Sequence, residues 1–179
     1  MPETAAGTGL GAATGSASGP LVLGPASFGE PAVQELVAQV QQEYVRRYGG
    51  PDDTPLPDGV FDPPDGAFFL GSVDGSPVAM GGWRLRRDVR PWGLVPAAEV
   101  KRMYVVPGAR RRGHAARVLA HLESTAREAG ASAMVLETGL AQPEAIGLYT
   151  AGGYREIEAF GYYAWSPSAR YFGKRLIRA

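Results

Sequence analysis

Three consecutive arginines followed by a glycine, Arg110-Arg111-Arg112-Gly113, are the most chemically suggestive stretch of the 179-residue chain. The residues before them, Val100 to Val106, favour a strand, and Pro107-Gly108 ends it. After the glycine, apolar side chains recur at helical spacing, at Ala115, Val118, Leu119, Leu122, Ala126 and Ala129. The turn should therefore lie where a helix begins, with free backbone N–H groups beside three guanidinium groups. Such a corner attracts phosphate.

The stretch Arg110-Arg111-Arg112-Gly113-His114-Ala115 resembles the Arg/Gln-x-x-Gly-x-Gly/Ala motif of the GNAT superfamily of acetyl-CoA-dependent N-acetyltransferases. A second segment, Gln142 to Tyr154, is similar to the family's Asn-x-x-Ala-x-x-Leu-Tyr-x-x-x-Gly-Phe pattern. A glutamate, Glu99, precedes the first motif on the expected strand. The resemblance extends over about residues 20–179 and implies transfer of acetyl from acetyl-CoA to a primary amine by direct attack.

The resemblance also implies how acetyl-CoA, as a co-substrate, would be held. The arginine-rich corner would bind the pyrophosphate, and Gly113 would be needed where the backbone takes a positive φ or closely approaches the phosphate. Main-chain groups of Met103 and Val105 would hold the pantetheine and the thioester carbonyl, and Gln142 could contact the coenzyme or only start a helix. The expected coenzyme-binding residues are Met103, Tyr104, Val105, Arg110, Arg111, Arg112, Gly113, His114, Ala115, Ala116 and Gln142. The alternative for the arginines is a solvated basic turn.

Removing a proton from the acceptor amine needs a base, and Glu99 is the candidate. It lies eleven residues before Arg110, a spacing similar to that of the base glutamate in some family members. Side chains alternate along a strand, so Glu99, Lys101, Met103 and Val105 share one face if no bulge intervenes. Four strand residues span roughly 13 Å, so Glu99 would act through water. The alternative is a structural ion pair with Lys101, which would weaken the base.

The departing thiolate must gain a proton, and the resemblance assigns this role to the hydroxyl of Tyr149. On a short helix that begins at Pro143, Tyr149 shares a face with Ala145 and Ile146. The alternative is a core tyrosine whose hydroxyl is already hydrogen-bonded.

Composition narrows the function classes. The chain has 18 basic and 18 acidic residues, so no overall charge attracts it to nucleic acid or a membrane. It has no cysteine and only two histidines, which argues against disulfides, a cysteine nucleophile and a metal centre. No apolar run approaches membrane-spanning length and no signal-peptide pattern begins the chain, so the cytoplasm is the expected location. The expected partner is a small-molecule amine, and a homodimer is left open.

Periodicity and turn residues predict the element order β-α-β-β-β-α-β-α-β-β, with helices beginning at Pro31, near residue 113 and at Pro143. The expected fold class is α/β with mixed α+β character. It is a single GNAT-like domain with a central mixed, mostly antiparallel sheet of six to seven strands and about four flanking helices. Residues 1–19, almost entirely Gly, Ala, Ser and Thr, are expected to form a flexible tail before an N-acetyltransferase domain over 20–179. Residues 49–66, rich in Pro, Asp and Gly, are expected to form a long loop that covers the acceptor site.

Three functions fit these features. The favoured one is acetylation of the primary amine of a small molecule. Acetylation of protein lysines or N-termini would need an open groove beside Glu99. A non-catalytic acyl-CoA-binding sensor would have the same arginine-rich coenzyme site, although the presence of both Glu99 and Tyr149 argues against a sensor. A longer acyl donor also fits.

Overall fold

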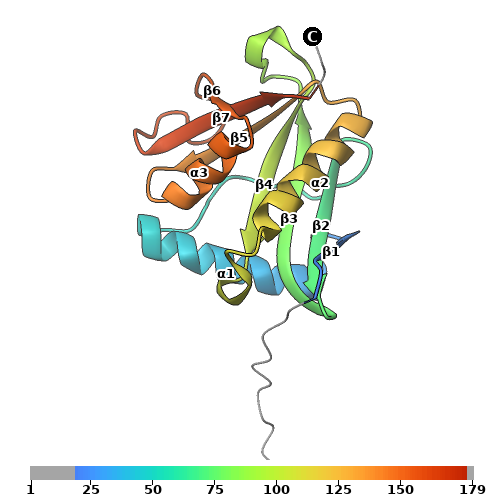
Figure 1. Cartoon of the computed structure of the whole chain (residues 1–179). Coiled ribbons are helices and arrows are strands. Elements are labelled where there is room, and N and C mark those ends of the chain that lie inside the picture. The colour runs from blue at the N-terminus through green and yellow to red at the C-terminus, as the bar shows by residue number, and fades with distance from the viewer. Residues whose placement is uncertain (1–18, 177–179) are drawn as a thin grey trace, which may run out of the picture.

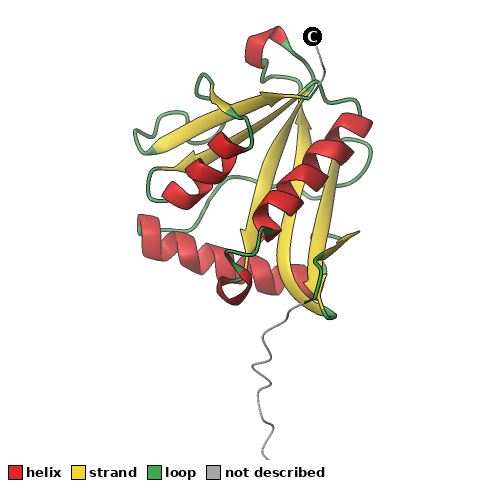
Figure 2. Cartoon of the chain, viewed as in Figure 1, coloured by secondary structure: helices red, strands yellow, loops and turns green. Residues whose placement is uncertain are grey.

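The computed structural model describes residues 19–176, and its order of helices and strands is the one that the sequence predicts. The elements are β1 (Val22–Pro25), α1 (Pro31–Tyr48), β2 (Gly66–Val73), β3 (Ser76–Arg86), β4 (Ala97–Val105), α2 (His114–Glu128), β5 (Ala133–Gly139), α3 (Pro143–Ala151), β6 (Arg155–Glu156) and β7 (Ala169–Arg175). Short 3₁₀ turns occupy Pro91–Gly93 and Pro107–Ala109. Figure 2 shows the helices lying against the strands. Residues 1–18 of the expected tail lie outside the described residues.

The sheet has seven strands in the order β1-β2-β3-β4-β5-β7-β6. Within the described residues, every neighbouring pair is antiparallel except β4 and β5, which are parallel. Those two strands pair only from Ala97 with Ala133 to Glu99 with Val135. Beyond these residues they diverge, and Figure 1 shows the two halves of the sheet opening like a V.

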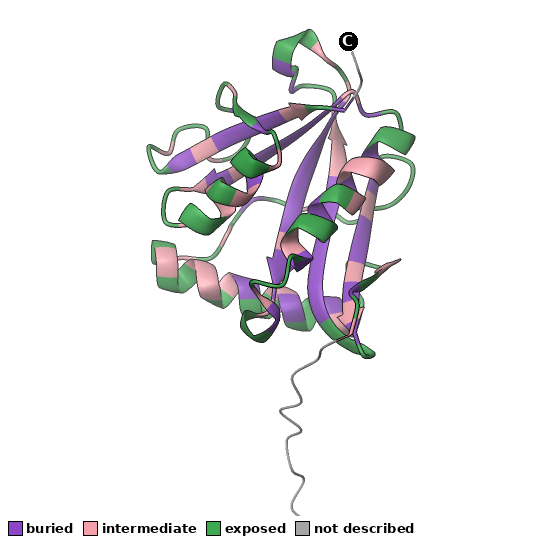
Figure 3. Ribbon diagram, in the orientation of Figure 1, coloured by how far each residue is buried: buried purple, intermediate pink, exposed green. Residues whose placement is uncertain are grey.

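The helices cover both faces of the sheet because each presents one apolar stripe to it. On one face, α2 and α3 close a core with the strands, whose helical members include Val118, Leu119, Leu122, Ala126 and Tyr149. On the other face, α1 packs against Phe68, Met80 and Tyr104. The burial pattern in Figure 3 follows this arrangement, with buried strands and exposed outer helix faces.

A β-bulge in the β3–β4 pair breaks the alternation of side chains along β4. The register shifts between Met80 and Gly82, and Arg102 on β4 has a φ of 54°. Ala98 and Val100 pack into the core under α2, and after the bulge Met103 and Val105 do so as well. Because side chains alternate before the bulge, Glu99 and Lys101 point to the other face. The expectation that all four side chains share one face is therefore wrong, because its condition of an unbulged strand is not met.

The described residues contain three α-helices rather than about four. The three are those whose starts the sequence predicts, at Pro31, near residue 113 and at Pro143, and residues 49–66, which contain five prolines, form no helix, as expected. Phe61 anchors this loop in the core beneath α1, where it is buried. No helix among residues 19–176 is long and apolar enough to cross a membrane.

Candidate active site

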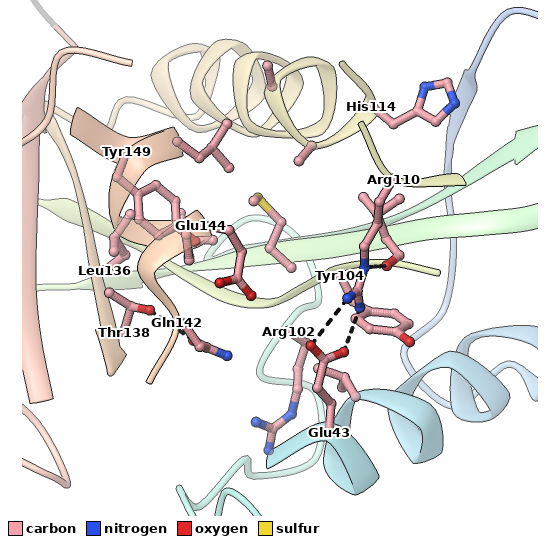
Figure 4. Close-up of a pocket in the computed structure, with 18 of the residues that line it drawn as sticks. Glu43, Arg102, Tyr104, Arg110, His114, Leu136, Thr138, Gln142, Glu144 and Tyr149 are labelled. Carbon is pink, nitrogen blue, oxygen red and sulfur yellow. Dashed lines mark hydrogen bonds and ion pairs between the residues drawn. The ribbon is translucent and has the colours of Figure 1, made fainter. Parts of the chain in front are cut away.

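A cleft of about 430 Å³ occupies the place where β4 and β5 part. Its walls come from α1, β4, the turn after β4, the start of α2, β5 and α3. In Figure 4, Thr138, Gln142, Glu144 and Tyr149 lie on one side of the cleft, and Glu43 with Arg110 lies on the other. The parting of two parallel strands therefore brings residues from both halves of the sheet around one space.

The start of α2 presents unpaired backbone donors to this cleft. Gly113 is the residue before the helix and has φ 78° and ψ 2°, the left-handed conformation that glycine adopts without strain. The first helical hydrogen bond runs from the N–H of Arg117 to the carbonyl oxygen of Gly113. The N–H groups of the three residues between, which include Ala115 and Ala116, therefore have no partner within the helix. Gly113, His114, Ala115 and Ala116 all line the cleft.

The three arginines of the turn have different surroundings. The guanidinium of Arg110 donates to the carbonyl oxygen of Val105 at 2.8 Å and pairs with Glu43 at 2.5 Å. Arg111 lines the cleft and Arg112 lies outside its lining. The arginine-rich turn thus faces the cleft through Arg110, Arg111 and backbone groups, and Arg110 also ties the turn to α1.

The end of β4 can offer main-chain groups to a ligand. Tyr104 and Val105 pair with β3 along one edge of the strand. Among the described residues, no strand pairs with β4 along its other edge after Glu99. Met103, Tyr104 and Val105 line the cleft at this point, and their binding of the coenzyme stays a prediction.

Tyr149 reaches the cleft from α3 and is 7% exposed. Its ring packs near Tyr154 and Phe172, and no residue within 19–176 hydrogen-bonds its hydroxyl. Burial raises the pKa of Tyr149 to about 12. The hydroxyl is therefore protonated throughout the neutral pH range, and none of residues 19–176 would have to be displaced from it.

Gln142 stands at the start of α3 and lines the cleft, but it does not cap the helix with its side chain. Its Oε1 accepts a hydrogen bond of 2.9 Å from the hydroxyl of Thr138 on β5. This contact fixes the amide, so that the Nε2 donor points away from Thr138 toward the cleft in Figure 4.

Glu99 lies in a buried cluster of cations rather than on the cleft wall. Its carboxylate is 2% exposed and contacts the Nε of Arg84 at 2.8 Å, Nη1 of Arg86 at 2.7 Å and Nζ of Lys101 at 3.1 Å. Burial alone would raise its pKa, but the charges of Lys101 and Arg84 hold the pKa below its ordinary value. The contact with Lys101 is the ion pair that the sequence left open as the alternative. A base role for Glu99 stays a prediction.

The sequence analysis did not single out the four carboxylates that line the cleft, Glu43, Asp52, Glu137 and Glu144. Glu43 is a charged residue on the stripe of α1 that also carries Leu36 and Val40, a signal that could have found it. Asp52 lies in the long loop, where acidic residues are ordinary. Glu137 carried a signal that could have found it, since it is a charged residue within the otherwise apolar strand Ala133–Gly139.

Comparisons with known proteins agree with this architecture. A family model described as the acetyltransferase (GNAT) family matches residues 35–154. Among solved structures, a Klebsiella pneumoniae protein named as an acyl-CoA N-acyltransferase aligns with a TM-score of 0.70 at 27% identity. The alignment covers 88% of this chain and 98% of that one.

Two curated relatives are similar in sequence. An IAA acetyltransferase from Azospirillum brasilense is 42% identical over 78 residues, which are 44% of this chain and 51% of that protein. The chain thus matches only about half the length of this relative. An aminoglycoside N(6')-acetyltransferase type 1 from Serratia marcescens is 33% identical over 98 residues, which are 54% of this chain and 67% of that protein.

Proposed function

The chain belongs to the GNAT family of acetyltransferases, and from this premise we propose that it transfers acetyl from acetyl-CoA to the primary amine of a small molecule. The transfer is a direct attack of the amine on the thioester while both substrates are bound. The relatives named for IAA and aminoglycoside acetylation support a small acceptor.

One observation carries the proposal: the unpaired amides at the start of α2 and the hydroxyl of Tyr149 line the same cleft. A diphosphate fits the first group, because a helix N-terminus offers N–H donors and the positive end of the helix dipole. A Cβ at Gly113 would meet no atom within 4 Å, so the backbone there is open to a ligand. The unpaired edge of β4 lies between the two sites and suits an extended amide-containing arm.

Two groups of the chain act on the reacting atoms. A main-chain N–H near Met103 or Val105 stabilises the oxyanion that develops on the thioester carbonyl, an effect usually worth about 3 kcal/mol. Tyr149 gives its proton to the sulfur as the C–S bond breaks. Its high pKa keeps the proton in place until negative charge develops on the sulfur.

A panel of amines tests the function. The purified chain is incubated with acetyl-CoA and amino acids, polyamines, aminoglycosides or short lysine peptides, and the release of free coenzyme A is measured. We expect release with one class of small amine and none with peptides. Tight coenzyme binding without release for any amine would contradict the enzyme and favour a sensor.

A further inference from the structure

A second pocket opens beside the ion pairs of Glu99. Its volume is about 540 Å³. The long loop forms one wall, the segment before β7 contributes Gly161 and Tyr162, and the end of β3 contributes Arg84 and Arg86. The start of α2 and Tyr149 line the first cleft and not this pocket, so the groups assigned to acetyl transfer leave the second pocket without a role.

The carboxylate of Glu99 connects this pocket with the cleft. Arg84 and Arg86, which line the pocket, contact its Oε2 at 2.8 and 2.7 Å. Lys101, which lines the cleft, contacts its Oε1 at 3.1 Å. One buried carboxylate therefore has the cations of the pocket on one oxygen and the cation of the cleft on the other, so the two spaces are neighbours.

The long loop is held in place where it passes from the cleft to the pocket. Asp52 lines the cleft and pairs with Arg102, and its Oδ1 accepts a hydrogen bond of 2.9 Å from the N–H of Thr54. Thr54 already lines the pocket. Between them, the N–H of Asp53 donates to the hydroxyl of Tyr163 at 2.8 Å. These contacts join the two loops that form the pocket and fix its walls.

Arg84 is the cation of the pocket that has unused donors. All three guanidinium nitrogens of Arg86 are bonded, Nε and Nη2 to Asp88 and Nη1 to Glu99. Arg84 donates only through Nε, to Glu99, and within residues 19–176 its Nη1 and Nη2 have no hydrogen-bond partner. The side chain is 16% exposed, and neither nitrogen is enclosed by protein. The paired N–H donors of a guanidinium fit two oxygens of a carboxylate or a phosphate.

The charges of this network also favour an anion. It contains three cations and two carboxylates, Arg84, Arg86, Lys101, Glu99 and Asp88. One positive charge is therefore left over. Asp65, the acidic residue of the pocket lining, pairs with Arg87 at 3.0 Å. An oxyanion in the pocket would neutralise the surplus charge, whereas a polycation would be repelled by it.

The strand register gives the distance between this pocket and the cleft. Arg84 lies opposite Glu99, and Gly82 lies opposite Lys101, two residues further along β4. Neighbouring strands are about 4.8 Å apart and two residues span about 6.6 Å, so the Cα atoms of Arg84 and Lys101 are roughly 8 Å apart. A small molecule can span this distance, with an anion at Arg84 and its amine in the cleft.

We propose that this pocket binds an oxyanion of the acceptor, a carboxylate or a phosphate, through Nη1 and Nη2 of Arg84. The inference rests on the proposed acetyl transfer and names its substrate class, which is an anionic amine such as an amino acid and not a polyamine or an aminoglycoside. Glu99 is a positioning residue for this site, because it holds the guanidinium of Arg84 through Nε and leaves the edge formed by Nη1 and Nη2 open.

The first test compares kcat/KM of wild type for pairs of amines that differ only in the oxyanion, at saturating acetyl-CoA. The pairs are 6-aminohexanoate with pentylamine, lysine with cadaverine, and 2-aminoethyl phosphate with ethanolamine. The first two pairs test a carboxylate and the third tests a phosphate. We expect the anionic member to be favoured by at least about 10-fold in the carboxylate pairs or in the phosphate pair. Equal values within every pair, or a preference for cadaverine, would overturn the proposal.

Two substitutions assign this preference to Arg84. Arg84→Lys keeps a cation beside Glu99 but loses the paired donors, so it should lower kcat/KM for the favoured anionic amine by about 10-fold. Arg84→Gln also removes the charge and should lower it by about 100-fold. Both variants should leave the member without the oxyanion within about twofold of wild type, because it makes no contact with the guanidinium.

Arg127→Gln is the matched control, since Arg127 is exposed at the end of α2 and lines neither space. It should keep the wild-type preference. An equal loss for both members of a pair in Arg84→Lys would show that Arg84 only supports the fold and would overturn its role. If Arg84→Gln does not fold, Arg84→Lys still decides.

Calorimetry separates this inference from the function on which it rests, because it needs no turnover. In the presence of coenzyme A, wild type should bind 6-aminohexanoate or 2-aminoethyl phosphate at least about 10-fold more tightly than the partner amine, and Arg84→Lys should lose most of the difference. If no amine is acetylated, the proposed function fails while this difference in affinity still supports the oxyanion site. If amines are acetylated and neither pair differs in affinity, acetyl transfer stands and the oxyanion site is overturned.

Discussion

Burial acts in the same direction on two side chains that line the cleft, Tyr149 and Glu137, but the consequences differ. It raises the pKa of Tyr149 to about 12, which keeps the phenol protonated until sulfur becomes anionic. It raises the pKa of Glu137 to about 7, which gives a carboxylate the basicity to accept a proton at neutral pH. One cleft thus holds two titratable groups whose neutral forms are favoured, because both lie away from water.

Replacement of Tyr149 by phenylalanine tests the acid role. The ring is kept, so packing against Tyr154 and Phe172 should persist, and only the proton donor is lost. We expect Tyr149→Phe to lower kcat by about 100-fold, in the range typical of general acids, with coenzyme affinity changed less than about threefold. Steady-state kinetics and calorimetry with coenzyme A measure the two quantities.

Tyr154 provides the matched control for that variant. Its ring lies 5.7 Å from that of Tyr149, but its hydroxyl bonds to Glu123 at 3.0 Å and it does not line the cleft. Tyr154→Phe should cost about 1 kcal/mol of stability through the lost hydrogen bond and leave kcat close to wild type. Equal kcat values for Tyr149→Phe and wild type would remove Tyr149 from the mechanism.

At the level of elements, the proposed coenzyme site depends on the turn between β4 and α2. Its glycine has a positive φ, and the helix that follows has fifteen residues, long enough for a substantial dipole at its start. The sequence predicted this arrangement, because a strand pattern, a glycine turn and a helical stripe follow one another directly. At this turn the backbone itself supplies the N–H donors that face the cleft, so no side-chain donor is required.

Two substitutions at Gly113 separate backbone strain from charge. Asparagine and aspartate have the same shape and both tolerate the left-handed conformation better than most residues, so each should cost roughly 1 kcal/mol of stability. Aspartate also puts a negative charge beside the phosphate site. We expect Gly113→Asn to weaken coenzyme A binding a few-fold and Gly113→Asp to weaken it by roughly 10-fold more. Calorimetry measures both affinities, and circular dichroism confirms that α2 persists.

Similar affinities for the two Gly113 variants would contradict the anion site at this turn. Loss of helical signal in both would show instead that the turn is needed for folding. The loss of affinity for the aspartate variant should also diminish as salt is raised, since screening weakens the repulsion.

The order of the elements could be predicted because short local sequence patterns indicate strands, helices and turns. The bulge in β4 could not be predicted in this way. The bulge at Arg102 is a property of a strand pair, in which β3 and β4 fall out of register, and no single segment encodes it. The ion-pair cluster of Glu99 was foreseen only in its contact with Lys101. Arg84 and Arg86 come from the neighbouring strand β3, and strand pairing alone brings them to this carboxylate.

At the scale of the whole molecule, the cleft exists because the two central strands, β4 and β5, pair over only part of their length. The parallel pair β4–β5 holds the two halves together over three residue pairs and then opens. Cores on both faces keep the halves in place around the opening. A molecule with zero formal net charge can therefore concentrate backbone donors, cations and carboxylates in a single cleft.

A ligand that contacts both halves of the sheet should stabilise the whole fold. Coenzyme A at a concentration of 100 times its dissociation constant adds about 2.7 kcal/mol to the free energy of unfolding if it binds only the native chain. For a domain of this size, that corresponds to a rise in melting temperature of roughly 5–10 °C. Differential scanning fluorimetry over a range of coenzyme A concentrations measures the rise. Tyr149→Phe should keep it and Gly113→Asp should lose most of it, because only the second change disturbs the phosphate site. An unchanged melting temperature of wild type at millimolar coenzyme A would contradict a binding site between the diverging strands.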